Sequence, residues 1–265
     1  MRIAVVAPSC TLDPTVPERV QALAEASFGA NAPEIVFHPQ CFLSEGHFAG
    51  PDGARIDALV EVANDPRFDA VWFARGGYGA CRVAEHAISR MNVAARGKRY
   101  MGYSDAGFLL AGLYAHGIGR PAHGPMPADI NRVGGDAAVA RALAGLMNPP
   151  PRSPEKAVAF NLTVLSQLLG TSLQPDLTDH ILMIEDVSEY MYRIDRSLFH
   201  ITGDPRIRRA AGIALGRCSD IPPNDPDFGQ SADQIVRHWC DANCIPFLGP
   251  ANIGHDAENT VVFFG

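Results

Sequence analysis

Short apolar segments alternate with helical patterns through the first half of the chain, and this alternation constrains the fold more than any other feature. The segments that predict strands are residues 2–7, 34–38, 70–74 and 100–102. Between them, apolar residues such as Ile56, Leu59 and Ala63 recur at helical spacing. Strands that alternate with helices are typical of a parallel sheet covered on both faces, and such sheets bind ligands at the carboxyl ends of their strands.

Two helix starts are specific enough to be predicted residue by residue. Thr15 is expected to cap the first helix, with Glu18 completing a capping box and Pro17 inside the first turn. Ser231 is expected to cap a helix that runs to about residue 242. A further helix is predicted from residue 105 to about residue 116.

A proline-rich segment divides the chain. Pro149, Pro150 and Pro151 are consecutive, so they cannot continue a helix and favour an extended linker. We therefore expect an N-terminal α/β domain over residues 1–147, a linker over 148–158 and a smaller C-terminal domain over 159–265. In that second part, the pattern predicts a helix at 161–169 and strands at 180–185, 213–216, 246–248 and 260–264.

Composition excludes several classes of function. The 265 residues carry a formal net charge of −7 with no long Lys/Arg cluster, so no nucleic-acid partner is expected. No apolar stretch approaches membrane-spanning length and the apolar start is too short for a signal peptide, so we expect a cytoplasmic protein with no membrane partner. The six scattered cysteines are expected to be free thiols. Cys240 and His238 lie on different faces of the predicted helix, which argues against a metal site there.

Ser104 is the first candidate for chemistry, because Gly102-Tyr103-Ser104-Asp105 lies where a strand meets a helix. A serine at such a sharp turn presents its hydroxyl above the sheet, and the backbone N–H of Asp105 points into the same space. The local sequence alone fits an ordinary helix N-cap at least as well.

The loop Arg75-Gly76-Gly77-Tyr78-Gly79 follows the third predicted strand. Its glycines would let the backbone approach a ligand closely and offer N–H groups to an anion or an oxyanion. It matches neither of the common phosphate-binding glycine motifs, and a simple tight turn is an equally good interpretation.

Two further residues could complete a catalytic group. Glu185 ends the apolar segment 181–184, and His255 lies in a predicted loop between late strands. A carboxylate can orient a histidine, and a histidine is the usual base that activates a serine. Each also has an ordinary structural explanation, and the chain has nine histidines from which spacing alone does not choose.

These segments together resemble the LD-carboxypeptidase family of serine peptidases, which includes the microcin-immunity peptidases. The matching segments, in family order, are Ala7-Pro8-Ser9, residues 74–79, Gly102-Tyr103-Ser104-Asp105, His123-Gly124-Pro125-Met126, Glu185-Asp186, Tyr192-Arg193-Ile194-Asp195-Arg196, and Gly254-His255 with Asn259. They span nearly the whole chain, and their conjunction in order is specific. The resemblance implies an N-terminal α/β parallel-sheet domain and a smaller, strand-rich C-terminal α+β domain.

The resemblance also implies a site and a reaction. Ser104 would be the nucleophile, His255 the general acid and base, and Glu185 the residue that orients it, with the N–H groups of Gly77 and Asp105 forming the oxyanion hole. The substrate would be a small murein peptide that loses its terminal D-alanine during cell-wall recycling, with no metal or cofactor. The family also suggests a homodimer.

Alternatives remain at this stage. A microcin-immunity relative would cleave an aminoacyl-nucleotide toxin, in which case Trp72, Trp239 or Tyr78 would be expected to stack on a purine. A non-catalytic small-molecule binding protein could use the same scaffold. The chain also has Ala159 and Phe160 where the family often has paired glycines, so Phe160 is expected to reshape whatever that segment lines.

Overall fold

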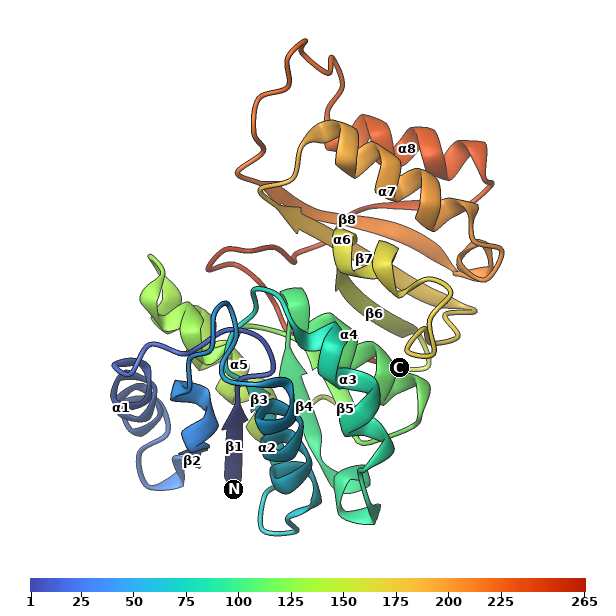
Figure 1. The fold of residues 1–265 in the computed structure, drawn as a ribbon. Helices are drawn as coiled ribbons and strands as arrows, with labels where there is room; N and C mark the ends of the chain where they lie inside the picture. Colours follow the sequence, from blue (N-terminus) through green and yellow to red (C-terminus); the bar gives the residue numbers. More distant parts are fainter.

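The computed structural model describes residues 1–265 as two sheets of mostly parallel strands, each with its own helices (Figure 1). The larger sheet has the strand order β10-β5-β4-β3-β1-β2. Its parallel strands are β1 (Arg2–Val6), β2 (Glu34–Phe37), β3 (Ala70–Phe73), β4 (Arg99–Gly102) and β5 (Arg120–His123). The order reverses at β1, so the carboxyl ends of β1, β3 and β4 open onto one edge where a site can form.

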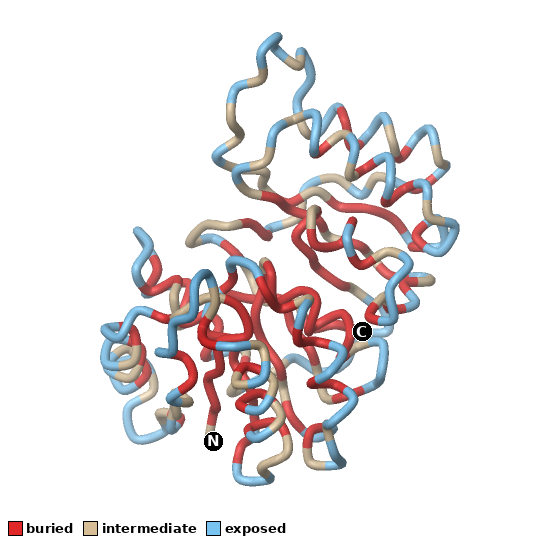
Figure 2. Tube along the Cα trace, in the orientation of Figure 1, coloured by how far each residue is buried: buried red, intermediate tan, exposed pale blue.

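Helices cover both faces of this sheet. They are α1 (Val16–Phe28) and α5 (Gly135–Met147) on one face, and α2 (Asp52–Asn64), α3 (Ala80–Ser89) and α4 (Gly107–Ala115) on the other. Alternation along β1 shows how the sheet serves two cores: Ile3 and Val5 join the cluster under α1 and α5, whereas Ala4 and Val6 join the other. The central strands β1, β3 and β4 are therefore almost wholly buried, and their traces are largely red in Figure 2, whereas β2 at the edge is only partly buried. None of the helices has both the length and the apolar character required to cross a bilayer.

The smaller sheet has four strands, and all of its pairings are parallel. They are β6 (Lys156–Asn161), β7 (His180–Val187), β8 (Gly212–Ser219) and β9 (Phe247–Pro250), accompanied by α6 (Leu162–Leu168), α7 (Met191–Gly203) and α8 (Ala232–Ala242). In Figure 1 this sheet and its helices lie above the larger sheet. The α/β class is thus confirmed, with a smaller sheet in the second half of the chain.

The end of the chain returns to the first sheet. The last strand, β10 (Val262–Phe263), pairs antiparallel with β5, and Phe264 then packs between Phe160 and Tyr114. Phe160 is 1% exposed and does not itself line any of the three cavities around Ser104 and α6, so its influence on what this segment lines stays a prediction. It packs instead in the junction between the two sheets. The proposed division into residues 1–147, 148–158 and 159–265 stays a prediction, but β10 belongs to the first sheet.

The predicted helix starts had different outcomes. Ser231 caps α8 as expected: its hydroxyl accepts from the backbone N–H of Gln234, whose side chain accepts from the N–H of Ser231. The capping box predicted at Thr15 and Glu18 is wrong. The Thr15 hydroxyl and backbone N–H both donate to the carboxylate of Asp13, at 2.7 and 2.9 Å, so a local turn takes the place of a cap.

This difference predicts different costs of mutation. Ser231→Ala should lower the free energy of unfolding by about 1 kcal/mol, because α8 loses its cap. Thr15→Ala should lower it by less than half as much, since Thr15 caps nothing and its partner Asp13 is exposed. Urea denaturation of the two variants measures both values. Equal losses would contradict this assignment of the caps.

Candidate active site

Ser104 lies on a sharp turn at the carboxyl end of β4. Its φ is +57°, in the left-handed region, and a short 3-10 turn (Ser104–Ala106) then leads into α4. This conformation costs a residue with a Cβ about 1–2 kcal/mol, and the surrounding structure must supply that energy. It turns the serine out of the path of the strand, as a strand-to-helix elbow requires.

Asp105, the residue after Ser104, anchors this turn through its side chain. The buried carboxylate of Asp105 accepts from the Ser9 hydroxyl at 2.5 Å and from the backbone N–H of Ala80 at 2.8 Å. Burial raises the pKa of Asp105, while these hydrogen bonds favour its charged form. The turn is thereby tied to the ends of both β1 and β3. This gives Ser9, which the sequence singled out only by resemblance, a physical role.

The glycine loop after β3 lies directly against Ser104. A Cβ added at Gly76 would be 2.9 Å from the Ser104 hydroxyl oxygen and 3.6 Å from the backbone nitrogen of Asp105. Gly77 has a φ of +116°, a conformation that glycine adopts without strain. The loop backbone therefore comes closer to the serine than any residue with a side chain would allow.

Glu185 and His255 form a buried pair. The Glu185 carboxylate is fully buried in β7, and one of its oxygens is 2.6 Å from Nδ1 of His255. The β7–β8 register shifts here, and Glu185 alone lies opposite two residues of β8, Gly216 and Arg217, which indicates a bulge in β8. Gly216 has no Cβ to displace Ile253, and the chain can therefore bring the His255 loop against the strand.

Asp186, adjacent to Glu185, faces the other side of the strand. Its carboxylate accepts from Asn161 at 2.8 Å and from the hydroxyl of Thr163 at 2.9 Å. These bonds fix the beginning of α6. The two consecutive acids of this strand thus have separate tasks, one for the histidine and one for the helix.

Arginines from both halves of the chain hold the His255 loop. Arg132 and Arg141 donate to backbone carbonyl groups of the loop, at His255, Ala257 and Asn259. From the second sheet, Arg217 forms an ion pair with Asp256. The loop is thereby fixed between the two sheets. Sequence analysis identified none of these arginines, since no motif distinguishes them from surface charges.

The other ring nitrogen of His255 is free. Nε2 is buried without a hydrogen-bond partner, and the ring lies against Tyr103, with the ring centroids 4.8 Å apart. The Tyr103 hydroxyl donates to Asp129 at 2.9 Å, so it does not compete for Nε2. His255 and Ser104 line the same cavity of about 530 Å³, although no hydrogen bond joins them. Catalytic hydrogen bonds are often longer before a substrate binds.

His123 lies close by but has a different environment. It is 1% exposed, and its Nε2 is 3.0 Å from the side-chain oxygen of Asn259. Burial lowers the pKa of His123 to about 4, so this ring is neutral at neutral pH. The Asn259 side-chain oxygen also accepts from the backbone N–H of Gly254. His123 therefore supports the His255 loop from β5.

The structure brings all five predicted site residues together: Ser104, Gly77 and His255 line one cavity, Asp105 adjoins Ser104, and Glu185 binds His255. Of the aromatic candidates, Trp72 is fully buried and Trp239 donates to Asp195 away from the cavity. Tyr78 alone is exposed beside Ser104, in a neighbouring cavity of about 300 Å³.

The structure shows no cluster of three His, Cys, Asp or Glu side chains that could hold a metal ion, and all six cysteines are free thiols.

Comparison with known proteins places this arrangement in a family. Residues 3–124 match the model of the LD-carboxypeptidase N-terminal domain, and residues 156–265 match that of the C-terminal domain. A putative carboxypeptidase of Synechocystis is 31% identical over 88% of this chain and 79% of its own length. The chain belongs to the LD-carboxypeptidase family. It is a serine peptidase.

Other relatives of this LD-carboxypeptidase include a murein tetrapeptide carboxypeptidase of Pseudomonas aeruginosa, 28% identical over 83% of this chain and 78% of its own length. The muramoyltetrapeptide carboxypeptidase of Oxalobacter formigenes has the same fold, with a TM-score of 0.82, 24% identity and coverage of 99% of this chain and 93% of its own. MccF in complex with glutamyl sulfamoyl guanosine superposes with a TM-score of 0.79 at 16% identity, covering 100% of this chain and 91% of its own.

The close approach of the glycine loop predicts a sensitive position. In Gly76→Ala the new methyl group would lie 2.9 Å from Cβ and Oγ of Ser104, so one of the two must move. Because a misplacement of about 1 Å can cost on the order of 100-fold in rate, we expect kcat/KM for peptide hydrolysis to fall at least tenfold. Steady-state kinetics with a peptide that ends in a D-amino acid measures this.

Gly53→Ala is the matched control, since nothing lies within 4 Å of a Cβ at that position in α2. Its activity should stay at the wild-type level. Full activity in Gly76→Ala would show that the loop does not approach Ser104 as closely as described.

Proposed function

We propose that this chain is an LD-carboxypeptidase that removes the terminal D-alanine of murein tetrapeptide in cell-wall recycling. Ser104 would be the nucleophile, His255 the general acid and base, and Glu185 the residue that orients His255. The observation that supports this most strongly is the buried pair of Glu185 and His255: Nε2 of His255 has no hydrogen-bond partner, and the residue lines the same cavity as Ser104. A histidine held by a carboxylate with its second nitrogen available is the arrangement that activates a serine.

The first half of the reaction forms an acyl-enzyme. Oγ of Ser104 attacks the carbonyl carbon of the L,D-peptide bond, and Nε2 of His255 takes the hydroxyl proton. Glu185 stabilises the imidazolium that results, because its carboxylate accepts from Nδ1. The backbone N–H groups of Gly77 and Asp105 donate to the oxyanion. The C–N bond then breaks, and the leaving amine of D-alanine receives the proton from His255.

The second half releases the acyl part. Water takes the place of D-alanine beside His255, which removes a proton as the water attacks the ester of Ser104. The C–O bond to Ser104 breaks, and His255 returns the proton to the serine oxygen. The products are the shortened peptide and D-alanine.

Arg75 is suited to bind the carboxylate of the terminal D-alanine. It is exposed and lines the cavity of Ser104 and His255. Arg75 forms no salt bridge, and its only side-chain hydrogen bond goes to the carbonyl oxygen of Thr11 at 3.2 Å. A guanidinium without a carboxylate partner can bind one from a ligand.

A second substrate class has one observation in its favour. Tyr78 is 52% exposed beside Ser104, where an aromatic ring could stack on a purine. An aminoacyl-nucleotide would then be cleaved by the same residues, as the likeness to MccF suggests. Family membership argues against the third candidate, a binding protein without catalysis. The homodimer and the cytoplasmic location stay predictions.

Release of D-alanine tests the proposed function. The purified chain should release it from L-Ala-D-Glu-meso-diaminopimelate-D-Ala, and Ser104→Ala should reduce kcat by about 10⁴-fold or more, because the covalent step is lost. An enzymatic assay of free D-alanine measures both. Hydrolysis of an aminoacyl sulfamoyl nucleotide without release of D-alanine would select the second substrate class, and equal D-alanine release by both proteins would remove Ser104 from the mechanism.

A further inference from the structure

A second pocket continues the active-site cavity toward α7. The cavity of Ser104 and His255 shares Gly77, Ser104 and Val187 with the cavity beside Tyr78. That second cavity in turn shares Thr163, Gln167 and Glu189 with a third, of about 380 Å³, between α6 and α7. The three cavities therefore form one groove that begins at His255 and ends on the helices of the smaller sheet. We call the third cavity the α6–α7 pocket.

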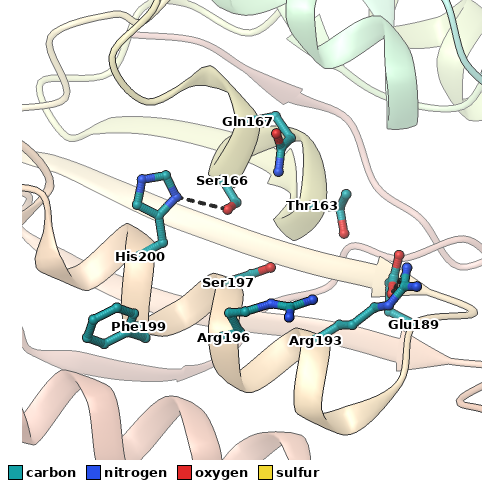
Figure 3. A pocket seen from close by; sticks show the side chains of 9 residues that line it. All are labelled: Thr163, Ser166, Gln167, Glu189, Arg193, Arg196, Ser197, Phe199 and His200. Carbon is teal, nitrogen blue, oxygen red and sulfur yellow. Dashed lines mark hydrogen bonds and ion pairs between the residues drawn. The ribbon is translucent and has the colours of Figure 1, made fainter.

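The α6–α7 pocket is lined almost entirely by polar side chains, as Figure 3 shows. Hydroxyl groups come from Thr163 and Ser166 of α6 and from Ser197 of α7, and Phe199 is the only hydrophobic residue in the lining. Two arginines and a histidine supply N–H donors, whereas Glu189 is the only acid. Such a lining repels apolar ligands and favours an anion.

Arg196 is the cation without a partner. Arg193 is 3.5 Å from Glu189, and His200 is hydrogen-bonded to Ser166 at 3.2 Å. The Arg196 guanidinium has no ion pair and no hydrogen bond. Its Cζ lies over the ring of Tyr192, 5.7 Å from the ring centroid. In Figure 3 it extends across the pocket in the space between α6 and α7. A free planar guanidinium is the side chain best suited to bind a carboxylate with two parallel hydrogen bonds.

The position of His255 gives the groove a direction. The group that protonates the leaving amine must lie on the leaving-group side of the scissile bond. His255 lines the first cavity and is absent from the second, while Ser104 lines both. D-alanine therefore leaves on the side of the first cavity. The acyl part of the substrate then extends through the second cavity toward the α6–α7 pocket.

We propose that the α6–α7 pocket, through Arg196, binds a free carboxylate on the acyl part of the substrate, one or two residues before the scissile bond. This inference rests on the proposed function. Diaminopimelate and glutamate each have a second carboxyl group, so a murein peptide retains free carboxylates there. An extended chain advances about 3.3–3.6 Å per residue, so a carboxylate one or two residues before the scissile bond lies that much farther along the acyl side of the groove. The pocket would thus select acidic murein peptides over neutral peptides that also end in D-alanine.

The test measures binding apart from catalysis. Calorimetry with the Ser104→Ala chain gives the Kd for intact L-Ala-D-Glu-meso-diaminopimelate-D-Ala and for the same peptide with its acyl carboxylates converted to amides. Adding Arg196→Gln should raise the Kd of the acidic peptide about tenfold, the value of one charge-assisted hydrogen bond, and leave that of the amidated peptide within about twofold. Arg196→Lys should recover part of the loss, since the charge returns without the planar geometry.

Arg237→Gln is the matched control, an exposed arginine on α8 that pairs with Asp233 outside the groove. It should change neither Kd. An equal effect of Arg196→Gln on both peptides, no effect on either, or no binding of the acidic peptide would overturn the assignment of the pocket. Release of D-alanine by the wild-type chain is scored separately. If binding depends on Arg196 but no D-alanine is released, the assignment of the pocket stands and the proposed function is contradicted. If D-alanine is released but binding does not depend on Arg196, the proposed function stands and the assignment of the pocket is contradicted.

Discussion

The buried hydrogen bond between Glu185 and His255 is the interaction on which the site depends, because it joins a strand of the second sheet to a loop that ends in the first. The chain leaves β9, passes His255 and then pairs β10 with β5. Burying a carboxylate costs free energy unless it is hydrogen-bonded, and Glu185 is fully buried. The His255 loop is therefore stabilised in the position where the histidine binds Glu185. The junction of the two sheets and the candidate catalytic geometry are therefore the same structural feature.

Strain and support are divided between the two halves of the chain. The first half contributes the left-handed turn at Ser104, and the network of Ser9 and Asp105 below it supplies the energy for that conformation. The second half contributes Glu185 and the bulge of β8 opposite it, which contains Gly216. The turn places the Ser104 hydroxyl close to the cavity, and the pairing with Glu185 places the imidazole of His255 there. Neither half alone presents both a serine and a histidine to a substrate, which accounts for the position of the cavity between the sheets.

Much of the fold could be predicted from the sequence, and the features that could not be predicted have physical reasons. The strands of the first sheet could be predicted, because each is a short apolar segment that stands between two helical patterns. The pairing of β10 with β5 could not be predicted, because a two-residue strand has no periodicity. Thr15 was wrongly predicted to be a helix cap, because its hydroxyl and backbone N–H groups donate to the carboxylate of Asp13. Neither residue by itself indicates this local turn. The contact of Phe160 with Phe264 could not be predicted, because the two residues are about 100 positions apart in the chain.

The candidate site shows the same contrast. Ser104, Glu185 and His255 became specific only through their order along the chain, since each has an ordinary structural explanation by itself. The arginines that hold the His255 loop belong to no local pattern that predicts their role, and Arg196 lies in a segment that the resemblance matched without assigning it a role. The contacts of the loop arginines come from segments far apart in the chain, as with Arg132 and the carbonyl oxygen of His255, 123 residues away.

The central claim is that Ser104 and His255 act as one unit across the two sheets, and a double-mutant cycle on kcat/KM for D-alanine release tests it most directly. If they act together, Ser104→Ala and His255→Ala should each remove nearly all the activity, and the double variant should be no more than a few-fold worse than either. Losses that multiply in the double variant would show that the two residues act independently, and would contradict the account.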